Sequence, residues 1–477
     1  MILLLDKLLA KEEWRKYHFL KKLEQSSYFS LPKKELCDQL EISNYVLKSI
    51  LEQLILDLEK FGLANEIQLQ VEDPFIQLEV SGMANSQTLL EKYVEESLCF
   101  QLLCGVVKRS YRSANDFSER KLISYPIVYN GCKQLNDYLN SVGLEVKQFR
   151  LTGSDERNIR LFLTELFSRV YKNNFEFYQQ SHCIFAQEKY AKLSIESLTM
   201  HQRMILKHFV YLTDLRIQQA AYCEISPSKK RSLVNDVNQN DHFFARVPQK
   251  FRENEVEVFL RYYYSRSEVF LPRLQQVEMP YVNQWSGFLL SALEGDFPSI
   301  NDYPDKKEIF LLRTKLIHFQ LLETSFGVEE LQPEINIYYF QQNYPQVLSF
   351  CRIYLKKFIK KFPELAGKKK WLFFNYLLLI LDSFPKQTLL QVVTIYVDFS
   401  FGSLYNRFII ENLSFFQLVG AEVCSSIQEA DIVLTDSREL GQNHLKDFVI
   451  WLSPPRPLDW ANLGERIIKK RLEKQLT

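Results

Sequence analysis

The chain has 477 residues, of which 46% are hydrophobic and 25% are charged, so the length predicts about three domains and the composition excludes disordered, collagen-like and coiled-coil classes. Only 14 residues are glycine, which leaves little material for glycine-rich phosphate loops or β-sandwiches. Lysines and arginines number 59 against 58 acids, a net charge of +1, so any contact with nucleic acid must come from a local patch. A mainly helical, multidomain protein is expected.

The cellular compartment is indicated by the cysteines and the apolar segments. Eight cysteines are scattered without a Cys-x-x-Cys pair, which favours a reducing compartment and predicts neither a disulfide framework nor a zinc site. The start of the chain lacks the layout of a signal peptide. The longest apolar stretch, Trp371–Leu381, is too short to span a bilayer. We expect a cytoplasmic protein without membrane contact.

The first domain, residues 1–82, has the pattern of a winged helix-turn-helix. A helix is expected over Lys11–Gln25, another over Pro32–Leu40, a turn at Glu41–Ser43 and a longer helix over Asn44–Phe61, with apolar residues at 3.6-residue spacing. Alternating residues on either side of Asp73-Pro74 predict a β-hairpin, the wing.

The second domain, residues 83–172, repeats this plan. The expected elements are helices at Leu89–Arg109, Ser113–Lys121 and Tyr125–Leu139, a turn at Leu122–Ser124, a short extended stretch at Leu144–Leu151 as the second wing, and a new helix capped by Ser154.

The remaining domains differ from one another in their predicted secondary structure. Residues 173–280 and 281–385 predict two helical modules with few strand signals between Phe175 and Ser383. Residues 386–477 predict a small α/β domain. Its expected strands are Leu389–Phe399, Ala421–Cys424, Asp431–Thr435 and Phe448–Leu452, and its expected helices are Ser403–Phe415 and Trp460–Lys474.

This order of parts resembles the Mga and AtxA type of virulence regulators of low-GC Gram-positive bacteria. The string Arg150–Phe162 looks like the Gly-x-(Asp-Glu)-x-x-Ile-Arg junction of regulators controlled by the sugar phosphotransferase system (PTS). The resemblance implies two PTS regulation domains (PRDs) in the middle and a fold similar to the EIIB component of sugar permeases at the end. It also implies a transcription regulator that binds promoter DNA, and a homodimer or higher oligomer formed through the C-terminal domain.

Candidate DNA contacts follow from the geometry of the motif, because the second helix of a helix-turn-helix enters the major groove with its first turns. We expect the DNA to be double-stranded, and curved or A+T-rich. The candidate residues are Ser43, Asn44, Tyr45, Lys48 and Ser49 in the first unit and Ser124, Tyr125, Tyr129, Asn130 and Lys133 in the second, with Lys108, Arg109, Arg112, Arg120 and Lys121 as candidate phosphate contacts.

Three histidines are candidates for phosphorylation, because phosphoryl relay through a protein needs an exposed imidazole nitrogen. His201 and His208 lie seven residues apart, so they are expected to share a helix face, and His318 is the matching candidate in the second module. A phosphocarrier protein of the PTS is the implied donor, and each histidine has the alternative role of a hydrogen-bonded packing residue.

Phosphocarrier or enzymatic chemistry would require particular residues in the C-terminal domain. A working EIIB component carries a cysteine just after its first strand, but Val397–Ser403 contains none and Cys424 lies on the second expected strand, so a structural or dimerising role is expected. Phosphate-loop, zinc-protease and nucleophile-elbow motifs are missing from the sequence. We therefore expect no enzyme, no cofactor and no metal. The basic residues of the last helix, Arg466 to Lys474, offer either a further contact or a solvated face.

Two other functions compete with direct DNA binding. One is a PTS-linked protein-interaction protein whose winged helices bind protein; exposed Lys48 and Lys133 on basic surfaces would argue for DNA instead. The other is RNA antitermination, but relatives with that activity begin with a small β-rich RNA-binding domain, whereas this chain begins with a helix-turn-helix pattern.

Overall fold

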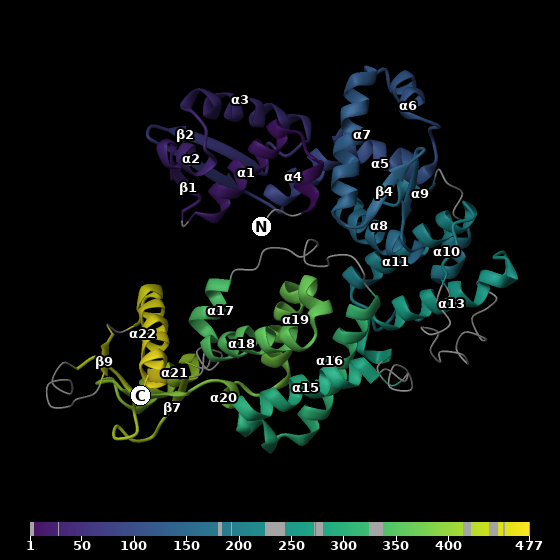
Figure 1. Ribbon diagram of the computed structural model, residues 1–477. Coiled ribbons are helices and arrows are strands. Elements are labelled where there is room, and N and C mark those ends of the chain that lie inside the picture. The colour runs from purple at the N-terminus through teal and green to yellow at the C-terminus, as the bar shows by residue number, and fades with distance from the viewer. Residues whose placement is uncertain are drawn as a thin grey trace. The chain divides into compact units, whose positions relative to one another are not determined.

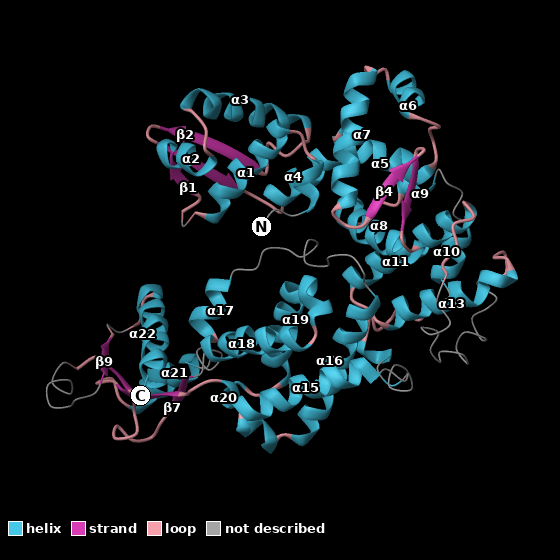
Figure 2. Cartoon of the chain, in the orientation of Figure 1, coloured by secondary structure: helices cyan, strands magenta, loops and turns pink. Residues whose placement is uncertain are grey.

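A computed structural model describes residues 4–26, 28–179, 184–191, 193–224, 244–270, 272, 280–323, 337–413, 421–437, 447–451 and 454–476. The described chain is mainly helical, as expected, and its strands form three small sheets (Figure 2). It divides into two compact units: unit 1 comprises Met1–Glu278 with Gln320–Glu334, and unit 2 comprises Met279–Phe319 with Ile335–Thr477 (Figure 1). Among the described helices, none has both the length and the apolar character needed to cross a membrane.

The first helix-turn-helix forms as the sequence predicts. After a 3₁₀ helix, η1 (Leu4–Leu8), and α1 (Lys11–Gln25), the motif consists of α2 (Lys33–Leu40) and α3 (Asn44–Lys60). Glu41 ends α2 in the left-handed conformation, with φ of 54°, and this residue redirects the chain into α3. The Ser43 hydroxyl then accepts a hydrogen bond from the Val46 amide at 3.4 Å and caps α3.

The first wing contains one strand more than expected. β2 (Ile67–Glu72) and β3 (Phe75–Val80) form the predicted antiparallel hairpin, and β1 (Ser30–Pro32) pairs with the free side of β3. The sequence indicates only a helix start at Pro32, which is in fact the N-cap of α2. A three-residue strand is too short to show alternation, so periodicity could not reveal it.

The second unit differs from its prediction at the first helix. The single helix expected over Leu89–Arg109 is wrong: α4 (Ser86–Glu96) and α5 (Leu98–Lys108) are separated by Ser97, whose backbone is extended. The Ser97 hydroxyl accepts a hydrogen bond from the Phe100 amide at 3.2 Å, and this local cap competes with continuation of the helix. The apolar residues keep their helical spacing across Ser97, so the sequence pattern does not reveal the break between α4 and α5.

The remainder of the second motif follows the prediction. α6 (Ala114–Lys121) is capped by Ser113, and α7 (Tyr125–Asn140) follows the turn at 122–124. Leu122 ends α6 with φ of 55°, as Glu41 ends α2. The two helix-turn-helix motifs therefore share a left-handed residue at the same place.

The second wing is a complete hairpin rather than one extended stretch. β4 (Leu144–Lys147) pairs with β5 (Arg150–Gly153), and the two turn residues, Gln148 and Phe149, both have positive φ. Such a turn normally uses Asn-Gly, so the Gln-Phe pair gave no hairpin signal. The next helix, α8 (Glu156–Tyr171), is capped by Asp155, one residue later than expected.

The middle of the chain consists of helices without strands, as expected, throughout its described part. In the part of unit 1 that follows α8, the described α-helices are α9 (Glu176–Gln179), α10 (Ile184–Ala191), α11 (Met200–Gln218) and α13 (Gln249–Tyr264). Those that follow are α15 (Pro280–Asp296), α16 (Pro304–Glu323), α17 (Ile337–Asn343), α18 (Pro345–Lys361) and α19 (Lys369–Ser383), with the 3₁₀ helix η7 (Pro363–Lys368) between the last two. The borders of the two proposed modules stay predictions.

The C-terminal domain has the expected α/β character. β6 (Val393–Asp398), β7 (Ala421–Val423), β8 (Ile432–Thr435) and β9 (Asp447–Ile450) form a parallel sheet in the order β7-β6-β8-β9. The helices are α20 (Lys386–Leu389), α21 (Ser403–Leu413) and α22 (Pro457–Leu476), which begins three residues before the predicted start. Side chains from the sheet, α21 and α22 form one apolar core.

A buried ionic network connects α8 to α11 and α13. Arg160 is 1% exposed and donates two hydrogen bonds to Glu255, of 2.6 and 2.9 Å, and one to Glu156 at 3.1 Å. Glu156 also accepts two hydrogen bonds from Arg216 of α11, at 2.8 and 2.6 Å. Loss of one partner from such a network leaves a buried charge uncompensated, so α8 is firmly tied to the first helical module.

Candidate nucleic-acid interface

The first turns of α3 present the predicted contact residues to solvent. Ser43, Asn44, Tyr45 and Lys48 are exposed, and Ser49 is half-buried. The exposed fractions of the Tyr45 residue and the Lys48 side chain are 83% and 78%. The opposite side of α3, with Leu47, Ile50 and Leu51, is buried, so amphipathic packing itself turns the polar face outward.

Local bonds constrain these side chains to different degrees. The Asn44 side-chain oxygen accepts a hydrogen bond from the Cys37 thiol at 3.3 Å, and Ser43 is the cap of the helix. Lys48 lies 3.9 Å from Glu52 in a fully solvated pair, which contributes little stability. Lys48 can therefore exchange this carboxylate for a phosphate at small cost.

The corresponding face of α7 is also open. Ser124, Tyr125, Tyr129, Asn130 and Lys133 are all exposed. The Ser124 side chain makes no cap hydrogen bond, unlike that of Ser43. The inner side of α7 packs closely on α5, because a Cβ at Gly131 would lie 2.9 Å from the Leu98 side chain. Glycine at this position allows the helix to sit against α5.

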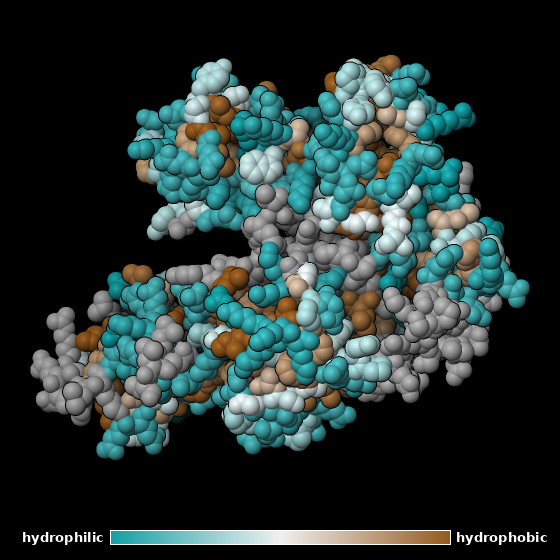
Figure 3. All heavy atoms as spheres, in the orientation of Figure 1, coloured by the Kyte–Doolittle hydropathy of each residue, from teal (hydrophilic) through white to brown (hydrophobic). Residues whose placement is uncertain are grey.

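Apolar side chains at the tip of the second motif were missed by the sequence reasoning. The exposed fraction is 94% for Leu122 and 55% for Ile127, and Figure 3 shows apolar surface at the top of the view, over the turn between α6 and α7. Exposed aliphatic groups at a recognition helix can contact thymine methyl groups in the major groove. Sequence patterning does not distinguish exposed apolar residues from buried ones, so only their exposure identifies them.

The five candidate phosphate contacts divide into two groups. Arg120 and Lys121 are exposed at the end of α6, next to the turn, and Arg112 is exposed just before α6 begins. Arg120 is also paired to Asp116 at 2.8 Å. Lys108 and Arg109 have partners in the first helical module instead: the ammonium of Lys108 lies 4.1 Å from the centre of the Phe177 ring, and Arg109 donates to the Gln219 carbonyl at 3.0 Å.

Residues 83–167 match the family model of the Mga helix-turn-helix domain. The chain contains an Mga-type helix-turn-helix domain. The matched range includes α4 to α7, the second wing and most of α8, so it contains the exposed face of α7. This finding confirms the resemblance to Mga-type regulators and supports a DNA-binding regulator. No match was found among the curated proteins.

The helical module that follows the Mga-type domain buries one of its two candidate histidines. His208 has no exposed surface, and its Nε2 lies 2.7 Å from the Lys172 carbonyl oxygen while Nδ1 lies 2.8 Å from the Tyr178 hydroxyl. Since a carbonyl can only accept, Nε2 carries the proton and Nδ1 accepts from the tyrosine. Neither nitrogen is available as a nucleophile in this arrangement.

His201 and His318 have opposite surroundings. His318 is fully buried, with Nδ1 2.8 Å from the Ser286 hydroxyl and Nε2 2.5 Å from the Tyr376 hydroxyl. His201 is exposed in the first turn of α11. His201 and His208 lie on the same side of α11, as expected. Only His201 reaches solvent, because α11 enters the core after its first turn.

Two amides of the loop after β6 already donate to side chains, one anionic and one neutral. The Ser400 amide donates to the Asp436 carboxylate at 2.9 Å, the Ser400 hydroxyl donates to the same group at 2.5 Å, and the Phe399 amide donates to Asn406 at 2.9 Å. Desolvation opposes ionisation of Asp436, but the bonds from Ser400 outweigh it and lower the pKa of this carboxyl group. Cys424 lies just beyond β7, not on the strand as expected.

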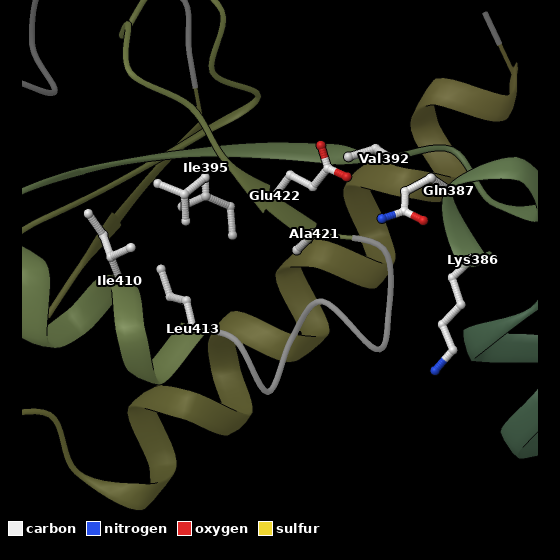
Figure 4. Close-up of a pocket in the computed structure, with 9 residues that line it drawn as sticks. Lys386, Gln387, Val392, Ile395, Ile410, Leu413, Ala421 and Glu422 are labelled. Atoms are coloured by element: carbon white, nitrogen blue, oxygen red, sulfur yellow. The ribbon is translucent and has the colours of Figure 1, made fainter.

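A pocket of about 310 Å³ lies between the β6–β7 edge of the sheet and α21. Figure 4 shows Ile395, Ile410 and Leu413 directed toward it, with Glu422 at its rim. Segment 414–420, which connects Leu413 to Ala421, lies outside the described residues. In the described part of the chain no group of His, Cys, Asp and Glu side chains is placed to hold a metal ion.

We predict that the stability of the protein falls in mild acid because of its buried histidines. Burial lowers the pKa of His208 to about 4 and that of His318 to about 3, whereas histidine in an unfolded chain has a pKa of about 6.5. Between these values the unfolded state binds protons that the folded state excludes, so the stabilisation is complete above about pH 6.5 and is lost as the pH falls. The loss for His208 is about 3 kcal/mol over the whole window.

Urea unfolding followed at pH 7, 6 and 5 measures this effect. The midpoint should fall with pH in the wild type, and His208→Gln should show a shallower fall because the titrating group is gone. Parallel pH profiles for the two proteins would contradict the assignment.

Proposed function

We propose that this DNA-binding regulator holds promoter DNA with both recognition helices, α3 and α7. The observation that carries the proposal is the shared geometry of the two motifs, in which a left-handed residue precedes a helix whose polar and basic first turns are exposed. Lys48 and Lys133 are both exposed, as direct DNA contact requires, and Lys48 has the acidic neighbour Glu52 at 3.9 Å.

The balance of charge suggests how the DNA is bound. With a net charge of +1, attraction depends on local lysines and arginines, whose phosphate contacts make binding sensitive to salt. Tyr125, Ile127 and Tyr129 add apolar surface suited to thymine. Curved or A+T-rich duplexes are accordingly the preferred targets in this proposal.

Fluorescence anisotropy with a labelled A+T-rich duplex over a salt series tests the proposal. Wild-type affinity should fall steeply with salt, and the variant N44A/K48A/N130A/K133A should bind at least tenfold more weakly, since one good base contact contributes about 1–3 kcal/mol. The control K306A/K469A removes the same net charge from exposed sites of unit 2 and should bind like the wild type. Absence of wild-type binding at low salt would refute direct DNA contact and favour the interaction-protein alternative.

We further propose that PTS signals reach the regulator through His201. Of the three candidate histidines only His201 is exposed, and phosphoryl transfer requires an accessible ring nitrogen. The new phosphate would lie at the N-terminal turn of α11, where the helix dipole favours negative charge. Transfer would break the N–P bond of a phosphorylated phosphocarrier protein and form an N–P bond on His201.

Incubation with a phosphorylated phosphocarrier protein should label the wild-type chain with acid-labile phosphate. The label should disappear in His201→Ala and persist in His208→Gln, whose replaced ring is buried. A wild-type chain that takes no label would rule out this route, and a label that survives His201→Ala would move the site to another residue.

The proposed homodimer rests on an exposed apolar face of the C-terminal domain. Phe401, Leu404 and Phe408 are 66%, 78% and 51% exposed, and they lie at and along α21. An apolar surface of this kind is typical of a protein-binding site. A second copy of the chain is the partner that we propose for it.

Sedimentation velocity measures the oligomeric state. The wild type should sediment as a dimer and the variant L404E/F408E as a monomer, because two buried carboxylates without partners oppose association. An exposed control, L458E (62% exposed), should remain dimeric; a monomeric wild type would contradict the proposal.

A further inference from the structure

Positive charge is concentrated on unit 2, where α18 ends and α19 begins (Figure 1). Residues 352–370 hold one arginine and seven lysines against a single glutamate, Glu364, in a chain whose net charge is only +1. Six of the exposed residues define the α18–α19 basic surface: Arg352, Lys356, Lys357, Lys360, Lys361 and Lys369. The positive charge of this segment therefore far exceeds that of the chain as a whole.

The pairing of these side chains distinguishes them from the other basic run of unit 2. On α22, Arg466 is bonded to Asp447, Lys470 to Glu473 and Lys474 to Asp431, so its charge is largely neutralised. On α18, within the described residues, Arg352, Lys356, Lys357 and Lys360 form no ion pair. Their charge is available to a partner.

The fold itself explains only part of this charge. Lys360 and Lys361 lie in the last turn of α18, where cations are favoured by the helix dipole. Arg352, Lys356 and Lys360 follow one another at four-residue spacing, which places like charges side by side and destabilises the helix. Lys369 begins α19, whose first turn has no acid, and a cation at this end is unfavourable. An anionic partner would remove both costs.

The chemistry of the surface indicates which anion it binds. Protein interfaces are enriched in aromatic residues, methionine and arginine and are depleted in lysine, whereas this surface has five lysines and one arginine. Lysine is a point charge suited to phosphate without geometric selection. Resting on the proposed function, we infer that the α18–α19 basic surface binds the phosphate backbone of double-stranded DNA, in addition to the contacts of α3 and α7.

The salt dependence of binding by the full chain tests this inference. Log affinity for a labelled 60-base-pair A+T-rich duplex is measured against log salt for the wild type, for K356Q/K360Q and for the control K306Q/K469Q, which removes equal charge from exposed positions elsewhere in unit 2. Each lost phosphate contact reduces the slope by about 0.9, so K356Q/K360Q should have a slope shallower by about two. The control slope should equal that of the wild type.

The outcomes separate this inference from the proposed function. If the wild type binds but K356Q/K360Q has an unchanged slope, the basic surface does not bind DNA, and an acidic protein becomes the partner to seek, while the proposed function stands. An equal change in the control would show a general charge effect and overturn the inference. If the wild type binds no duplex at all, the proposed function itself fails. Thermal unfolding of both variants checks that these exposed Lys→Gln changes leave the fold intact.

Discussion

The buried guanidinium of Arg160 is the contact on which the organisation of unit 1 depends. It bonds Glu255 of α13 and Glu156 of its own helix, and Glu156 in turn holds Arg216 of α11. α8 closes the range matched by the Mga-type family model, so the helix that completes the DNA-binding domain is also a core element of the next module. Loss of one partner would leave a buried charge uncompensated, so this network fixes α8 against α11 and α13.

The two helix-turn-helix motifs achieve the same geometry with different chemistry. Glu41 and Leu122 occupy the same left-handed position. The residue is an exposed glutamate in the first motif and a leucine that is 94% exposed in the second. The Cβ atom of an L-residue makes this conformation sterically unfavourable. The helix that follows each turn is amphipathic, so the burial of its inner face determines which side chains face outward.

Much of this architecture follows from periodicity in the sequence, and its failures have identifiable physical causes. Both motifs, the first hairpin and the parallel strands were predictable because their apolar residues repeat at the period of the element. The break at Ser97 was not predictable, since a side-chain cap leaves the period of the apolar residues unchanged. The Gln148-Phe149 turn was not predictable either, because it lacks the Asn-Gly pair that is typical of such turns. At the candidate site, the exposure of the first turns of α3 and α7 could be predicted. The contacts of Lys108, Arg109 and His208 could not, because their partners are distant in sequence. Ion pairing likewise could not be anticipated: three basic residues of α22 are paired with acids, whereas Arg352, Lys356, Lys357 and Lys360 of α18 form no ion pair within the described part of the chain.

The loop after β6 has a consequence for phosphate binding by the C-terminal domain. Its amides donate to Asp436 and Asn406, so the protein carries a built-in anion where a phosphate-binding loop would keep its donors free. A phosphate approaching Ser400 would have to displace this carboxylate, because two negative groups at one place repel each other. In our proposal, phosphate therefore enters the protein at His201, and the loop after β6 takes no part in its transfer.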